Sequence, residues 1–101
     1  MTIKKIQDKI RQKKYRFSDH SVKRMIKRNV TRQEVESTIL TGEIIEEYPD
    51  DKYSPSCLVY GITENRRDLH IHVSLPPIVI IISVYPLRGK PRPSGRGWTA
   101  R

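Results

Sequence analysis

The 101-residue sequence predicts an α+β domain, with N-terminal helices packed on one face of a small antiparallel β-sheet meander of three or four strands. Apolar side chains recur at helical spacing over residues 3–41 and alternate as in strands over residues 43–85. A run of helices followed by a run of strands is typical of this class. We expect one domain over residues 1–87 and a basic C-terminal tail, rich in proline, glycine and arginine, over residues 88–101.

The first helix is expected over residues 3–14, where Ile3, Ile6 and Ile10 recur at i, i+3 and i+7 between basic side chains. We expect its apolar face to cover the core, although a helix this basic could instead lie on an acidic surface. Residues 15–17 follow as a link or a short edge strand.

Two further helices are predicted next, and each has start and stop signals. Ser18 is a good N-cap for the first, and Asn29 tolerates the left-handed conformation of a C-cap. Thr31 and Glu34 have the spacing of a capping box for the second, so we expect Glu34 to be used in that cap. Gly42 can end this helix.

The helix that follows Ser18 is expected to have two different faces. At roughly 100° per residue, Val22, Met25 and Ile26 share one side, which we predict packs on the core. The other side carries a histidine and two arginines at i, i+4 and i+8, namely His20, Arg24 and Arg28. Either this side is only a solvated basic face, or it offers a titratable imidazole beside fixed positive charge.

The strands are expected over residues 43–48, 57–63, 69–75 and 78–85, separated by polar turns and by Pro76-Pro77. Residues 69–75 alternate most clearly, with four aliphatic side chains on one face and His70, His72 and Ser74 on the other. Residues 78–85 are apolar on both faces until Ser83 and Tyr85, which predicts a central strand covered by a helix.

The composition narrows the class of partner. Twenty lysines and arginines against eleven acidic residues give a net charge of +9, which favours a polyanionic partner: RNA or another nucleic acid, an acidic protein or an anionic membrane. The longest apolar run is far below the ~20 residues of a membrane span, and no signal peptide is evident. We expect a cytoplasmic protein without membrane association. The single cysteine, Cys57, is expected to be a buried strand residue rather than a nucleophile.

Histidine, tyrosine and arginine side chains are the candidates for chemistry. His70 and His72 share a strand face, but two histidines without a third ligand do not make a metal site, so we expect no metal and no cofactor. A metal-free ribonuclease needs a base for the ribose hydroxyl, an acid for the leaving oxygen and cations for the charge on phosphorus. This chain contains those residue types.

The stretch F-S-D-H-S-V-K-R-M-I-K-R-N-V-T-R-Q-E-V, followed by strands with L-H-I-H-V and I-I-S-V-Y, resembles the bacterial family catalogued as domain of unknown function 4258. The resemblance covers residues 16–86, and its pattern falls here on His20 with Ser21, Arg24 with Met25, Arg28, Asn29 and Tyr85. That family looks related to the RelE/ParE-like (barnase–EndoU–colicin–RelE) small toxins. The relationship implies a compact α+β fold, often an mRNA-cutting toxin held in check by an antitoxin.

The resemblance therefore implies a toxin-like RNA-acting domain, of metal-independent ribonuclease or mRNA interferase type. The expected catalytic residues are His20, Arg24 and Tyr85, and the expected RNA- or phosphate-binding residues are Arg28, His70 and His72. The alternative is a non-catalytic basic module that binds nucleic acid or an antitoxin through charge. A third reading is structural, with His20 and Arg24 tying the helix to the sheet.

Overall fold

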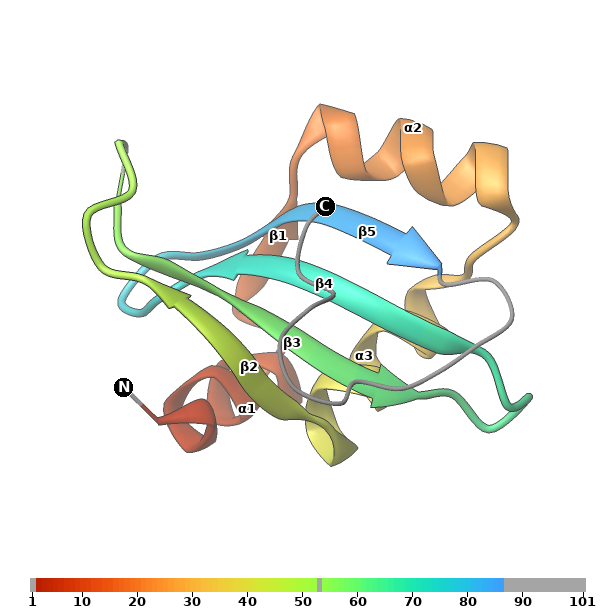
Figure 1. Cartoon of the computed structure of the whole chain (residues 1–101), viewed down its shortest axis with the longest axis horizontal. Helices are drawn as coiled ribbons and strands as arrows, with labels where there is room; N and C mark the ends of the chain where they lie inside the picture. Colours follow the sequence, from red (N-terminus) through yellow and green to blue (C-terminus); the bar gives the residue numbers. More distant parts are fainter. Residues whose placement is uncertain (1, 53, 87–101) are drawn as a thin grey trace.

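The structure, a computed structural model, describes residues 2–52 and 54–86 (Figure 1). In these ranges it has three helices and a five-stranded sheet, so the α+β class is confirmed. The helices are α1 (Ile3–Arg11), α2 (Asp19–Arg28) and α3 (Arg32–Thr41). The strands are β1 (Tyr15–Phe17), β2 (Glu43–Tyr48), β3 (Ser56–Ile62), β4 (Asp68–Ser74) and β5 (Val79–Pro86). The tail predicted over residues 88–101 lies outside the described residues.

The sheet has the order β1-β5-β4-β3-β2, and β2 to β5 form the predicted antiparallel meander. The prediction of an all-antiparallel sheet was wrong at one edge, because β1 pairs with β5 in parallel and makes the sheet mixed. The predicted end of the first helix was also wrong. That helix stops at Arg11, and Lys13 takes a left-handed conformation (φ 61°) that turns the chain into β1.

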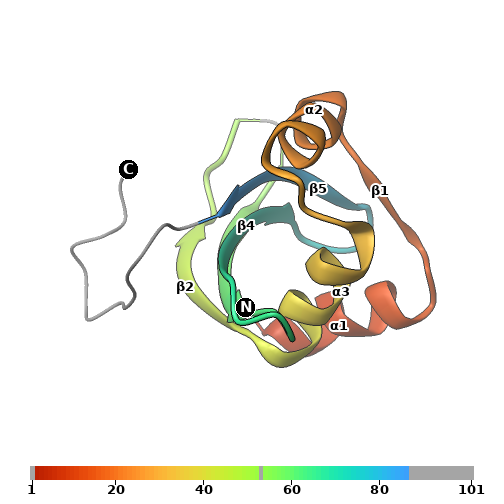
Figure 2. The ribbon, with the colours of Figure 1, turned by 90° about the vertical axis from the view of Figure 1, so that its right-hand side faces the viewer.

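The sheet curves around α1 and α3 (Figure 2). α3 packs on β3 and β4, and α1 packs on α3. We call the side of the sheet that faces these two helices the inner face and the opposite side the outer face. All the helices were expected on one face, but α2 instead lies along β5, separate from the layer of α1 and α3.

The inner face forms the core. Leu69, Ile71 and Val73 of β4 are each 0% exposed and belong to the core, as expected for one face of this strand, whereas Leu75 lies past the end of β4 and is only partly buried. Cys57 is also fully buried, as expected, and burial raises the pKa of its thiol to about 12. Gly61 lets α3 approach β3 closely, since a Cβ there would lie 2.7 Å from the carbonyl oxygen of Thr38.

Both predicted caps of α2 are present. The Ser18 hydroxyl accepts a hydrogen bond from the backbone N–H of Ser21, and Asn29 adopts the left-handed conformation with φ 58°. Ser18 also fixes the start of the helix on β5, because its N–H donates to the Ile81 carbonyl and its hydroxyl donates to the Ile82 carbonyl. The position of α2 beside β5 therefore follows from its N-cap.

The predicted apolar face of α2 was only partly right. Met25 is buried, but Val22 is 41% exposed and Ile26 is 76% exposed. The buried positions are Ser21 and Met25, four residues apart. Anchoring of the N-cap on β5 turns these two residues inward, so the small Ser21 occupies the place that the periodicity assigned to Val22.

Candidate functional site

The outer face carries a line of aromatic and charged side chains across β3, β4, β5 and α2. Tyr60 pairs with His70 and His70 pairs with Tyr85 in the strand register, so the three side chains lie on one face. The Tyr60 and His70 rings meet edge to face, with centroids 5.9 Å apart. The Arg24 guanidinium carbon lies 5.3 Å from the centroid of the Tyr85 ring, within cation–π range. We call these four residues the outer row.

A second group, the serine–histidine cluster, consists of Tyr48, Asp51, Ser56 and His72. Oγ of Ser56 lies 2.5 Å from Oδ2 of Asp51 and 2.9 Å from Nε2 of His72. The Asp51 carboxylate is 3.6 Å from the same imidazole nitrogen. The Tyr48 ring meets the His72 ring edge to face at 5.4 Å. The cluster thus holds the His72 ring from two sides.

Burial favours the neutral form of His72. Loss of hydration lowers the pKa of this imidazole below its usual value, and the nearby Asp51 carboxylate only partly offsets that effect. His72 is therefore mainly neutral at pH 7. Its side chain keeps 23% of its surface exposed, so a ligand on the outer face can reach it.

Two buried polar atoms of this region have no hydrogen-bond partner within the described part of the chain. They are Nε of Arg24 and Oγ of Ser83. Ser83 lies directly across from His72 in the register of β4 and β5, next to Tyr85 along the same face. Buried polar atoms in folded proteins are normally paired, so these two mark the α2 side of the outer face as unusual.

The structure brings together some of the predicted site residues and leaves others apart. Arg24, Tyr85 and His70 meet in the outer row, and His72 lies two residues from His70 on β4. His20 and Arg28 are exposed on α2, one turn before and one turn after Arg24. Within the ranges described, neither of these two side chains makes a hydrogen bond or ion pair.

His70 differs from His72 in its surroundings. It is 6% exposed and lies between Tyr60 and Tyr85 on the neighbouring strands. Among residues 2–52 and 54–86, no group of three histidine, cysteine, aspartate or glutamate side chains is arranged to hold a metal ion. The outer face therefore offers acid–base groups and a guanidinium.

The sequence analysis missed the residues that surround His72. The alternation of β3 puts Ser56 and Tyr60 on one strand face, and this signal could have placed Ser56 near the β4 histidines. Asp51 lies in the turn after β2, where nothing in the sequence pattern distinguishes it from Asp50. The contact of Asp51 with Ser56 and His72 therefore became visible only from the backbone path of this turn in the structure.

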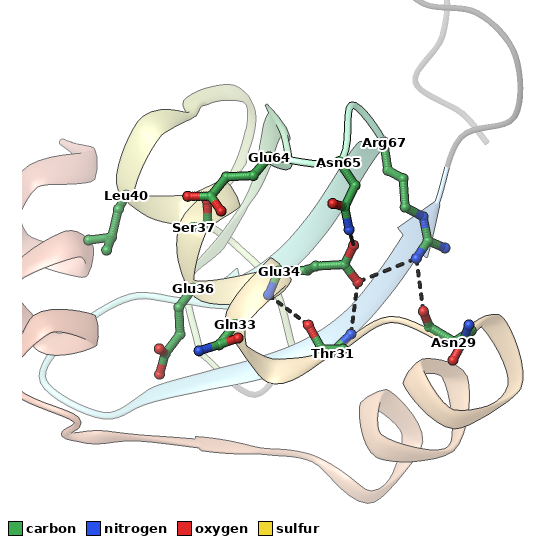
Figure 3. Close-up of a pocket in the computed structure, with 10 residues that line it drawn as sticks. All are labelled: Asn29, Thr31, Gln33, Glu34, Glu36, Ser37, Leu40, Glu64, Asn65 and Arg67. Carbon is green, nitrogen blue, oxygen red and sulfur yellow. Dashed lines mark hydrogen bonds and ion pairs between the residues drawn. The ribbon is translucent and has the colours of Figure 1, made fainter.

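A different polar region lines a cavity of about 630 Å³ between the α2–α3 connection, α3 and the β3–β4 hairpin (Figure 3). Glu34 accepts hydrogen bonds from the backbone of Thr31 and from the side chains of Asn65 and Arg67. Arg67 also donates to the carbonyl of Asn29, 2.8 Å away, at the end of α2. We call these five residues the Glu34–Arg67 network.

This network holds elements together. Thr31 and Glu34 form the predicted capping box of α3, so the expectation for Glu34 is confirmed. Arg67 donates to the carbonyls of Arg28 and Asn29, the last backbone acceptors of α2, and pairs with Glu34 at 3.3 Å. Half of the residues that line this cavity therefore belong to a network whose members already bind one another.

No helix in the described part of the chain is long and apolar enough to cross a membrane.

The chain was compared with curated proteins, solved structures and family profiles. No curated protein and no solved structure matches it. One family profile matches residues 17–86, a range that contains α2, α3 and all the strands except the first two residues of β1. The match covers more than half of the chain, so the protein belongs to the family described as a domain of unknown function, DUF4258.

Proposed function

We propose that this protein is a toxin-like RNA-acting domain, a metal-independent endoribonuclease of RelE/ParE-like type that an antitoxin protein keeps in check. The observation that carries the proposal is the stacking of Arg24 on Tyr85, next to a strand with two histidines. A guanidinium held against a ring is preorganised, so it can bind a phosphate without first losing side-chain freedom.

The chemistry needs three groups around one phosphodiester. His72, mainly neutral at pH 7, takes the proton of the ribose 2′-hydroxyl, whose oxygen then attacks phosphorus. Arg24 stabilises the negative charge that grows on the phosphate oxygens. Tyr85 orients the leaving 5′-oxygen, which takes a proton from the Tyr85 hydroxyl or from a water molecule held by it as the phosphorus–oxygen bond breaks. The products are a 2′,3′-cyclic phosphate and a free 5′-hydroxyl.

The spacing of the outer face suits this assignment. His70 lies opposite Tyr85, and His72 is therefore its diagonal neighbour, a relation that separates Cα atoms by roughly 7–8 Å in antiparallel sheets. A phosphodiester fits between side chains at that spacing. In this proposal, the exposed His20 and Arg28 contact flanking phosphates along α2, and His70 supports Tyr85 from the neighbouring strand.

The test is cleavage of RNA by the purified full-length chain in the presence of EDTA. The substrates are an end-labelled single-stranded RNA and an mRNA bound to ribosomes, so that free RNA and ribosome-bound RNA are both tested. We expect cleavage that leaves a 2′,3′-cyclic phosphate and that disappears when the ribose at the cleaved position is replaced by deoxyribose.

Matched variants on α2 and β4 assign the roles. Arg24→Ala and His72→Ala should abolish most cleavage, whereas Lys23→Ala removes an exposed charge one residue from Arg24 and should change it little. His20→Ala tests the exposed histidine in the same assay. Absence of cleavage of both substrates, or cleavage that survives Arg24→Ala in a folded protein, would overturn the proposal.

A non-catalytic basic module is the second candidate, and the exposed charges of α2 favour it. Lys23, Lys27 and Arg28 are all exposed on this helix. If these charges act only by attraction, RNA affinity should fall steeply with salt, and deletion of residues 88–101 should weaken it. His20→Ala should then have no effect, and Arg24→Lys should be tolerated.

A further inference from the structure

The serine–histidine cluster has a defined direction of hydrogen bonding. An aspartate carboxylate can only accept hydrogen bonds, so the Ser56 hydroxyl donates to Oδ2 of Asp51 at 2.5 Å. The oxygen of Ser56 then has lone pairs but no further proton for its second neighbour. That neighbour is Nε2 of His72 at 2.9 Å, which must therefore be the donor.

We propose that Ser56 and Asp51 are positioning residues that keep the ring proton of His72 on Nε2, so that Nδ1 is left as the proton acceptor on the outer face. The inference rests on the proposed function, in which His72 takes the proton of the ribose hydroxyl. The inference names Nδ1 as the nitrogen that accepts this proton, and Ser56 and Asp51 as the residues that leave Nδ1 unprotonated.

The surroundings of His72 support this assignment. Ser56 is 0% exposed, so water does not compete for its hydrogen bonds. The Asp51 carboxylate lies 3.6 Å from Nε2, on the same side of the ring as Ser56. Nδ1 has no hydrogen-bond partner among the residues that the structure describes. The edge-to-face contact with Tyr48 restricts rotation of the ring.

The arrangement is not that of a serine nucleophile. In a Ser–His–Asp triad the serine and the carboxylate bind opposite nitrogens of the imidazole. Here Asp51 and Ser56 both lie at Nε2, and the serine gives its proton to the carboxylate. Because Ser56 is also buried, the group left to react with a substrate is the imidazole.

Among residues 2–52 and 54–86, few titratable or polar groups face His72. Asp51 is the charged group at Nε2, and Tyr48 on β2 has its hydroxyl 2.5 Å from the Glu46 carboxylate. His70 lies two residues away on β4, and the uncharged Ser83 lies across on β5. Asp51 is therefore the acid whose removal should act most directly on the ring.

The test is nuclear magnetic resonance of the full-length chain with ¹⁵N-labelled histidine. The chain has three histidines, and His20→Gln and His70→Gln identify the signals that belong to His72. Above the pKa of His72, we expect a single tautomer protonated on Nε2. Ser56→Ala and Asp51→Asn should each shift the tautomer ratio toward Nδ1 protonation, by roughly tenfold, the weight of one hydrogen bond. Asp51→Asn should also lower the pKa of His72 further.

The controls come from the same turn. Ser54→Ala removes an exposed hydroxyl that donates to the Pro55 carbonyl, and Asp50→Asn removes an exposed neighbouring acid. Both should keep the wild-type tautomer. Protonation of His72 on Nδ1 in the wild type, or a ratio that neither Ser56→Ala nor Asp51→Asn changes, would overturn the inference.

Cleavage assays separate this inference from the function on which it rests. If wild-type protein cleaves RNA, Ser56→Ala should lower kcat with little change in KM, because substrate binding is retained while the base is misdirected. A wild type that has the expected tautomer but cleaves no RNA would refute the proposed function and leave the anchoring of His72 standing.

Discussion

Two polar regions in the described part of the chain differ in whether their buried groups are paired. In the Glu34–Arg67 network, the Glu34 carboxylate and the Arg67 guanidinium bind each other and the ends of two helices. On the outer face near α2, Nε of Arg24 and Oγ of Ser83 are buried without a partner in the described part of the chain. The cavity of about 630 Å³ belongs to the first region. This cavity thus lies at a structural site, and the unsatisfied groups point to the candidate functional one.

Arg24→Ala should have the largest effect on activity. Removal of a preorganised cation at a phosphate typically costs about 100-fold in rate or more. The fold should lose only the contact with Tyr85, about 1 kcal/mol. The measurements are RNA cleavage and thermal unfolding, with Lys23→Ala as the charge-matched control. A large loss of stability with unchanged activity per folded molecule would assign Arg24 a structural role.

Arg67→Ala should lower the stability of the fold and leave the activity of the folded protein nearly unchanged. It leaves Glu34 with one fewer donor and the carbonyls of Arg28 and Asn29 uncapped, which should cost about 2 kcal/mol in the free energy of unfolding. The neighbouring Arg66 is exposed, and Arg66→Ala serves as the control in denaturant unfolding. If Arg67→Ala lowered cleavage while leaving stability intact, the network would have to be reassigned as part of the functional site.

The pH dependence of the free energy of unfolding should show the protonation of His72. Because burial lowers its pKa in the folded state, the unfolded chain binds a proton more readily, and stability falls as the pH drops below about 6.5, the usual histidine value. His72→Gln should reduce this loss in urea unfolding between pH 7 and pH 5. Asp51→Asn should extend the loss to lower pH, since the carboxylate raises the pKa of His72. An unchanged profile in both variants would argue against a buried neutral imidazole.

Ser83→Ala should have the smallest effect on the free energy of unfolding, and Ser74→Ala, its matched control, should have the opposite effect. Removing a buried hydroxyl without a partner should leave stability unchanged or raise it by up to about 1 kcal/mol. Ser74 on β4 is equally buried, but its hydroxyl donates to the Ile78 carbonyl and accepts from the Ile80 N–H. Ser74→Ala should therefore cost about 1–3 kcal/mol in the same unfolding experiment. Equal losses in the two variants would remove the contrast between paired and unpaired groups.

Local signals predicted the elements of this fold well. Ser18 and the pair Thr31 and Glu34 act as caps within a few residues, so the sequence was enough to place the starts of α2 and α3. The parallel pairing of β1 with β5 joins residues 15–17 to residues 79–81, and no local pattern encodes such a distant partner. The rotation of α2 about its axis, which exposes Ile26, also depends on residues distant in the sequence, because the hydrogen bonds from Ser18 to β5 determine it.

The candidate site also has a part that the sequence predicts and a part that only the structure gives. Arg24, Tyr85 and the β4 histidines could be singled out from residue type and from the family resemblance. That Arg24 stacks on Tyr85 depends on the contact between α2 and β5. The bonds that Asp51 and Ser56 make to each other and to His72 depend on the turn after β2, where composition predicts a turn and not its path.

The central claim is that RNA binds the outer face beside α2 and not the cavity lined by the Glu34–Arg67 network. The most direct measurement is titration of ¹⁵N-labelled protein with an oligoribonucleotide that carries 2′-O-methyl groups and so cannot be cleaved through its 2′-hydroxyls. We expect the largest chemical-shift changes at Arg24, His72 and Tyr85, with little change at Glu34, Asn65 and Arg67. Changes centred on those last three residues, or no saturable change on the outer face, would contradict the account.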